Sequence, residues 1–121
     1  MKRHILLIED NEQNRYLTTF LLEKHGYRVT SAATGPAGVQ LARELLPDLI
    51  LLDVQLPGMD GYAVATALKA DARTSGIPIV VVTSCAMAGD REKVLATGAE
   101  GYLEKPIDPE TFVGDVERYL V

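Results

Sequence analysis

The sequence contains no tryptophan and a single cysteine, Cys85. One cysteine excludes an intrachain disulfide, and a reducing cytoplasm is the simplest setting for such a chain. No apolar run approaches the roughly 20 residues of a membrane-spanning helix. The apolar run at residues 5–8 stops at two acids, too early for the apolar region of a signal peptide. The sequence therefore predicts a cytoplasmic protein that does not enter a membrane.

Basic residues are fewer than acidic residues in this chain. The chain has 12 Lys and Arg against 17 Asp and Glu, for a net charge of −5. The basic residues are scattered along the chain, which argues against nucleic acid as a partner. With 121 residues, of which 47% are hydrophobic, the chain has the size and composition of one domain with its own core. Linkers, repeats and low-complexity segments are absent from the sequence, and its last helix is expected to leave no room for an effector domain.

Short apolar runs alternate with segments of helical periodicity. The runs cover residues 5–8, 28–33, 49–52, 79–82 and 101–103. Residues 49–52 and 79–82 are apolar at every position, which is typical of strands covered by helices on both faces. The more polar run at 28–33 suits an edge strand. Since crossovers between parallel strands are right-handed, we expect an α/β fold: a doubly wound five-stranded parallel sheet of flavodoxin-like order 2-1-3-4-5.

Capping residues divide the segments between the runs into five helices. Asp10 or Asn11 can cap the first helix, and Gly26 ends it. The starting signals of the other helices are Thr34-Gly35-Pro36, Asp60, residues 89–92 and Asp108-Pro109-Glu110. Within the first helix, the spacing of Leu17, Phe20 and Leu21 predicts an apolar face.

Polar side chains follow four of the five predicted strands. They are Glu9 and Asp10, Asp53, Thr83 and Ser84, and Lys105. The carboxyl ends of parallel strands meet at one edge of a sheet, so these groups should lie together. Three carboxylates in one pocket stay ionised only beside a cation, and oxygen ligands suit Mg²⁺. A lysine and a hydroxyl add partners for phosphate oxygens, so the set predicts phosphoryl transfer with Asp53 as nucleophile.

Four motifs carry a resemblance to a known family. They are Ile8-Glu9-Asp10-Asn11, Asp53 followed by Pro57-Gly58-Met59-Asp60-Gly61, Thr83-Ser84, and Tyr102-Leu103-Glu104-Lys105-Pro106. With these motifs in this order, the whole chain, residues 1–121, resembles the receiver domain of two-component response regulators. The resemblance implies a phosphorelay signalling switch that accepts phosphate from a histidine kinase or a histidine phosphotransfer protein.

The resemblance also implies a role for each site residue. Asp53 is the phosphoacceptor. The Mg²⁺ ligands are Asp10, Asp53, Glu9 through a water molecule, and the backbone carbonyl of Gln55. Glu9 stands where Asp is commoner in the family. Thr83 hydrogen-bonds the phosphoryl group, Lys105 pairs with it, and Tyr102 is the aromatic switch residue.

The family resemblance also predicts two protein-binding surfaces. A downstream target should bind the face made by the fourth helix, fifth strand and fifth helix, near Tyr102. The donor protein should dock near Leu17, Thr18 and Leu22 on the first helix. The only chemistry expected of the chain itself is phosphoryl acceptance and slow autodephosphorylation, so it is not expected to be an enzyme with turnover.

Three alternatives stay open from the sequence. The chain can be a receiver from a hybrid histidine kinase that relays phosphate, since residues 86–93 look like such receivers as well as like stand-alone cell-cycle regulators. An α/β phosphatase with an Asp nucleophile usually has a second acid two residues later, where this chain has Gln55. A flavin-binding module would need a Gly- or Ser-rich loop after the first strand, and this chain has acids there.

Overall fold

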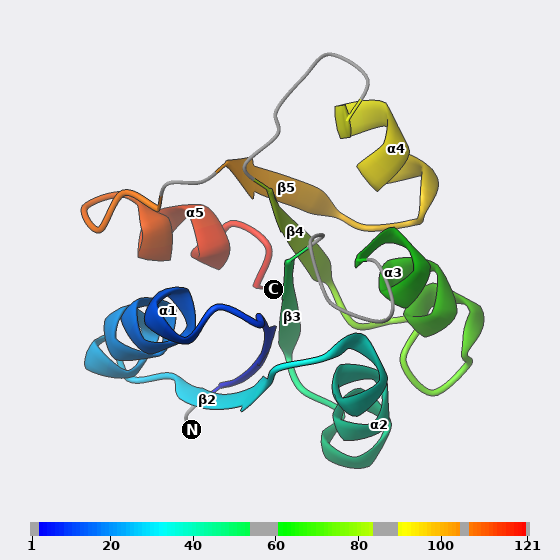
Figure 1. The fold of residues 1–121 in the computed structure, drawn as a ribbon, viewed down its shortest axis with the longest axis horizontal. Helices are drawn as coiled ribbons and strands as arrows, with labels where there is room; N and C mark the ends of the chain where they lie inside the picture. The colour runs from blue at the N-terminus through cyan, green and yellow to red at the C-terminus, as the bar shows by residue number, and fades with distance from the viewer. Residues whose placement is uncertain (1–2, 54–60, 84–89, 105–106, 121) are drawn as a thin grey trace.

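The computed structural model describes residues 3–53, 61–83, 90–104 and 107–120, which form alternating strands and helices (Figure 1). The strands are β1 (His4–Ile8), β2 (Arg28–Ala32), β3 (Leu49–Asp53), β4 (Ile79–Thr83) and β5 (Gly101–Glu104). The helices are α1 (Glu12–Lys24), α2 (Gly35–Leu45), α3 (Gly61–Ala70), α4 (Asp90–Ala96) and α5 (Phe112–Glu117). The predicted alternation of strands and helices is confirmed.

The five strands form one parallel sheet in the order β2-β1-β3-β4-β5. Helices α1 and α5 cover one face of this sheet, and α2, α3 and α4 cover the other (Figure 1). The predicted doubly wound sheet of order 2-1-3-4-5 is therefore correct. The residues of β3 and β4 are buried at every position because both strands lie between two helical layers.

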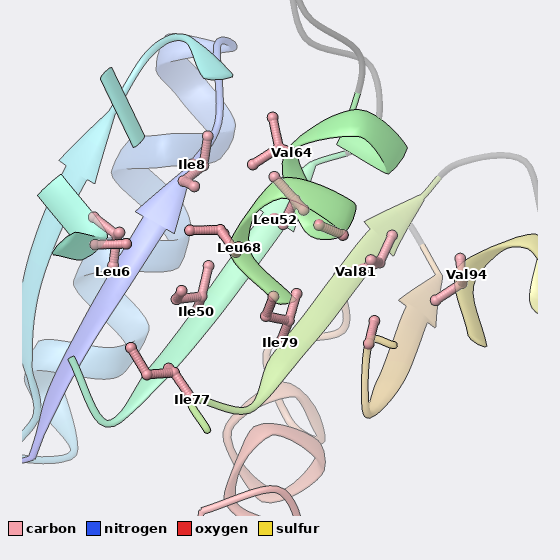
Figure 2. Packing of buried hydrophobic residues seen from close by; sticks show 13 residues of the cluster. Leu6, Ile8, Ile50, Leu52, Val64, Leu68, Ile77, Ile79, Val81 and Val94 are labelled. Carbon is pink, nitrogen blue, oxygen red and sulfur yellow. The ribbon is translucent and has the colours of Figure 1, made fainter. Parts of the chain in front are cut away.

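Each face of the sheet has its own apolar core, because successive side chains of a strand point to opposite faces. Leu6 and Ile8 of β1 pack with α2, α3 and α4, whereas Ile5 and Leu7 pack with α1 and α5. Figure 2 shows the first of these cores, in which Val64 and Leu68 of α3 lie over the central strands. Full burial of one such aliphatic side chain stabilises the fold by about 1.5–3 kcal/mol. The two cores fix the ends of the central strands, where the polar side chains lie.

The connection between β1 and α1 is set by the helix cap. Asn11 caps α1, and its side chain accepts a hydrogen bond of 2.9 Å from the amide of Asn14. Of the two residues that the sequence allowed as the cap, the structure uses Asn11 and leaves Asp10 outside the helix. At the other end, Gly26 adopts a φ of 91°, as expected for the residue that ends the helix.

Two expectations for the helices are wrong. The α-helix of α5 begins at Phe112, with Thr111 as its cap, and not at Pro109. Asp108 accepts a hydrogen bond of 2.9 Å from the amide of Glu110, but residues 109–111 form turns that precede the helix. In α1, Phe20 is 51% exposed and does not belong to the buried face.

Within the described ranges, all helices are too short or too polar to cross a membrane.

Candidate functional site

The ends of β1, β3 and β4 lie side by side at one edge of the sheet. Ile8 of β1 aligns with Leu52 of β3, so Glu9 follows directly beside Asp53. Asp53 aligns with Val82 of β4, one residue before Thr83. Asp53 and Thr83 are the last residues of their strands and are 3% and 1% exposed. The predicted convergence of polar groups at the strand ends is confirmed for these residues.

Glu9, Asp10 and Asp53 form a carboxylate cluster. One oxygen from each lies within 4.8 Å of the others. Glu9 and Asp53 are buried and Asp10 is exposed, so the cluster opens to solvent on the side of Asp10. Two unit charges about 5 Å apart repel each other by roughly 3 kcal/mol at an effective dielectric constant of 20. Oxygen-only ligands at this spacing suit a hard divalent cation, which would offset that repulsion.

The amide, the carboxylate and the carbonyl of Glu9 each make a hydrogen bond. Its amide donates a hydrogen bond of 2.9 Å to the carbonyl of Ala32 at the end of β2. Its carboxylate accepts a hydrogen bond of 3.3 Å from the amide of Asn11, and its carbonyl accepts one of 3.0 Å from Nη1 of Arg15. The first and third contacts fix the backbone of Glu9, and the hydrogen bond from the Asn11 amide orients its carboxylate.

Thr83 and Tyr102 lie on the same face of the sheet. Val81 aligns with Tyr102 and Thr83 aligns with Glu104, so Thr83 and Tyr102 are diagonal neighbours on adjacent strands. Tyr102 is half-buried and packs against the core beneath α3 and α4. A change at the end of β4 therefore has a short path to Tyr102.

Two residues of the predicted site, Gln55 and Lys105, lie outside the described residues, as do Ser84 and Cys85. Their roles stay predictions. Lys105 follows Glu104, the residue that aligns with Thr83, in the sequence.

The predicted docking residues on α1 are corrected by the structure. Thr18 and Leu22 are buried, at 2% and 0% exposed; Leu22 belongs to the core, and Leu17 packs partly against it. The side chains of α1 that reach solvent include Tyr16 and Phe20, which are 74% and 51% exposed. Residues one helical turn apart share a helix face, so these two aromatic rings form one exposed stripe.

The sequence also matches known proteins. The family profile named response regulator receiver domain covers residues 5–117. The chain belongs to this family. It is 40% identical over 120 residues to the polar-differentiation response regulator DivK of Brucella ovis. The aligned region covers 99% of this chain and 98% of that protein. The family match favours neither the phosphatase nor the flavin-binding interpretation.

Solved receiver structures have the same fold. Chemotaxis response regulator CheY4 of Vibrio cholerae superposes with a TM-score of 0.94 at 28% identity, covering 99% of this chain and 100% of that one. The receiver domain of sensor histidine kinase PA1611 from Pseudomonas aeruginosa has a TM-score of 0.91 at 35% identity, with coverage of 99% and 98%. That structure has a magnesium ion coordinated in its active site cleft. Receiver domains of two-component systems are generally signalling switches and interact with histidine kinases or phosphotransfer proteins.

Proposed function

We propose that this receiver domain accepts a phosphoryl group on Asp53 and works as a switch that changes a protein-binding surface. The convergence of Glu9, Asp10 and Asp53 within 4.8 Å is the observation that carries the proposal. Asp53 ends the central strand β3 and is 3% exposed, so its carboxylate has a fixed position. A nucleophile held in a fixed position favours in-line phosphoryl transfer.

The reaction exchanges one bond to phosphorus for another. A carboxylate oxygen of Asp53 forms the new P–O bond while the P–N bond of the donor phosphohistidine breaks. The electron pair of the broken bond stays on the imidazole, which then takes up a proton. Thr83, at the neighbouring strand end, would donate a hydrogen bond from its hydroxyl to the phosphoryl group, and Lys105 is expected to neutralise one of the phosphoryl oxygens. Slow hydrolysis of the aspartyl phosphate resets the switch without sustained turnover.

The carboxylate cluster fits a magnesium ion. Asp10 and Asp53 would bind it directly, Glu9 would bind it through water, and the carbonyl of Gln55 is expected to complete the protein ligands. When bound, Mg²⁺ neutralises the carboxylates and the phosphoryl oxygens. Asp10 is the exposed member of the cluster and provides the side on which the ion and the phosphate can enter.

The output face that we propose lies at α4, β5 and α5. A groove of about 340 Å³ on this face is lined by Leu95, Glu100, Gly101, Tyr102, Leu103, Glu104 and Tyr119. Leu95 is 46% exposed and supplies an apolar contact at the rim. Because Tyr102 both lines this groove and neighbours Thr83 on the sheet, a shift of Thr83 toward the phosphate would change the groove. The phosphate then acts by favouring one of two conformations of this face.

Phosphorylation of Asp53 can be tested directly. Wild type, Asp53→Asn and the exposed control Glu12→Gln are incubated with a phosphorylated histidine kinase and Mg²⁺, and incorporated phosphate is measured. Borohydride reduction followed by mass spectrometry identifies the modified residue. We expect label in wild type and Glu12→Gln and none in Asp53→Asn. Equal labelling of Asp53→Asn would overturn the assignment.

A hybrid-kinase relay is the second candidate, based on the 35% identity with the PA1611 receiver, which is lower than the 40% identity with DivK. A relay returns phosphate quickly to a histidine phosphotransfer protein, whereas an output switch retains it. Mixing labelled protein with such a phosphotransfer protein and following the label over time separates the two functions.

A further inference from the structure

Arg15 is a charged residue that points back at the carboxylate cluster from the first turns of α1. Its Nη1 atom donates a hydrogen bond of 3.0 Å to the backbone carbonyl of Glu9, six residues earlier in the chain. Its side chain is half-buried and lies in a surface groove of about 290 Å³, lined by Glu12, Arg15, Tyr16, Thr19 and Ser31. The guanidinium therefore crosses from the surface of α1 to the peptide that joins Glu9 to Asp10.

That peptide determines where the carboxylate of Asp10 can lie. Upstream, the amide of Glu9 is fixed on β2, and downstream, Asn11 is fixed as the cap of α1. The Glu9 carbonyl between them accepts from Arg15, so this hydrogen bond restricts rotation of the Glu9–Asp10 peptide. Asp10 itself is exposed, so packing restrains its side chain little.

We propose that Arg15 is a positioning residue for the metal pocket: by holding the Glu9 carbonyl, it sets the placement of Asp10 and with it the affinity for Mg²⁺. The inference rests on the proposed function, because it assigns Mg²⁺ to the carboxylate cluster. Arg15 contacts a backbone atom of Glu9 and is not itself a ligand.

Two physical effects of Arg15 on the pocket have opposite signs. As a fixed hydrogen-bond donor, it should strengthen Mg²⁺ binding by preorganising the ligands. As a nearby positive charge, it should weaken Mg²⁺ binding by repulsion. The sign of the change on removing the side chain therefore separates positioning from simple charge.

The test measures Mg²⁺ affinity by calorimetry in wild type, Arg15→Met, Arg15→Lys and the surface control Arg118→Met. Met keeps the aliphatic stem and the helix propensity but has no donor. We expect Arg15→Met to bind Mg²⁺ about tenfold more weakly, at the low end of the effect of outer-shell partners. Arg15→Lys should recover part of the loss, and Arg118→Met, whose side chain is 79% exposed, should match wild type.

A second readout needs no metal. In the metal-free protein, amide hydrogen exchange of Asn11, which donates to the Glu9 carboxylate, should be faster in Arg15→Met while amides in the middle of α1 stay unchanged. Unchanged or tighter Mg²⁺ binding by Arg15→Met overturns the inference. If wild type binds no Mg²⁺ at millimolar concentration, the proposed metal site fails, and exchange of Asn11 alone then decides whether Arg15 orders this connection.

Discussion

The ammonium of Lys69 and the carboxylate of Glu100 form an ion pair of 2.8 Å that joins the end of α3 to the residue before β5. The same ammonium donates to the carbonyls of Ser75 and Ile77, at 3.1 and 2.9 Å. The other carboxylate oxygen of Glu100 accepts a hydrogen bond of 2.8 Å from the amide of Ile79, the first residue of β4. The starts of β4 and β5 are thus tied to one lysine through Glu100, which also lines the groove at Tyr102.

Replacing Lys69 should destabilise the fold. Its side chain is 13% exposed and has three acceptors, so Lys69→Met leaves carbonyls of the α3–β4 connection without their donor. We expect a loss of about 1.5–3 kcal/mol in the free energy of unfolding, measured with urea. Lys24→Met, at an exposed position near the end of α1, is the control and should change stability by less than about 0.5 kcal/mol. Equal effects of the two substitutions would contradict the role of Lys69.

A side chain at Gly101 should displace the side chain of Tyr119. A Cβ atom at this position would overlap the phenol end of the Tyr119 side chain, which would have to shift. Because Tyr119 packs partly against the core, its displacement is expected to make Gly101→Ala cost about 1 kcal/mol, at the low end of overpacking. Gly114 lies in α5 with open space around it, so Gly114→Ala should instead stabilise by about 0.5–1 kcal/mol. Thermal unfolding of both variants gives the comparison, and the same sign for both would refute this account.

Magnesium should stabilise the protein through the carboxylate cluster. A ligand that binds only the folded state adds about 2.7 kcal/mol at a hundred times its dissociation constant. We expect the Tm of wild type to rise with Mg²⁺ concentration, and the rise to shrink in Asp10→Asn, which lacks the exposed carboxylate of the cluster. Glu12→Gln is the matched control and should respond like wild type. A Tm that does not respond to Mg²⁺ in wild type would count against the site.

The contribution of Tyr27 to the free energy of unfolding should decrease at alkaline pH. Burial, together with the hydrogen bond and the negative charge of Glu117, raises the pKa of Tyr27 from 10.0 to about 12. Between these values the unfolded chain loses the phenolic proton while the folded chain keeps it. The stabilising contribution of Tyr27 is therefore complete below pH 10 and is lost as the pH rises to about 12. The stability difference between wild type and Tyr27→Phe should shrink over this range in chemical denaturation.

The exposed aromatic stripe on α1 should affect the rate of phosphotransfer from protein donors but not from small-molecule donors. Phe20→Ser removes an apolar group that is 51% exposed, so stability should change little. We expect phosphotransfer from the cognate kinase to slow by roughly tenfold, as for a moderate interface contact of about 1.4 kcal/mol. Phosphorylation by a small acyl phosphate, which needs no docking surface, should keep its wild-type rate. A loss with both donors would place the defect in the site itself.

The sequence predicted the sheet well because β3 and β4 are apolar at every position before their terminal polar residue. Only strands covered on both faces give such runs, and the polar residue that ends each run marks the edge of the sheet. The convergence of Asp53 and Thr83 followed from topology alone. Which residue caps α1 did not, because Asp10 and Asn11 are both good caps and only the structure assigns the role to Asn11.

The sequence did not predict the features that depend on side-chain direction. Thr18 is buried and Phe20 is exposed, although their apolar character predicts the reverse. The two residues lie about 200° apart around the helix, so they cannot share the buried face. No sequence pattern predicts the contact of Arg15 with a backbone carbonyl. The charged end of a long cationic side chain in the first turn of a helix usually lies in water.

Asp53 and Thr83 end the two strands whose every residue is buried. Amides in such strands exchange with solvent mainly when the whole domain unfolds, so the proposed phosphate acceptor is attached to the slowest-opening part of the molecule. A charge added to Asp53 should therefore distort β3 and β4 little. Its effect should therefore be detected first in the amide exchange of the half-buried β5, and last in β3 and β4.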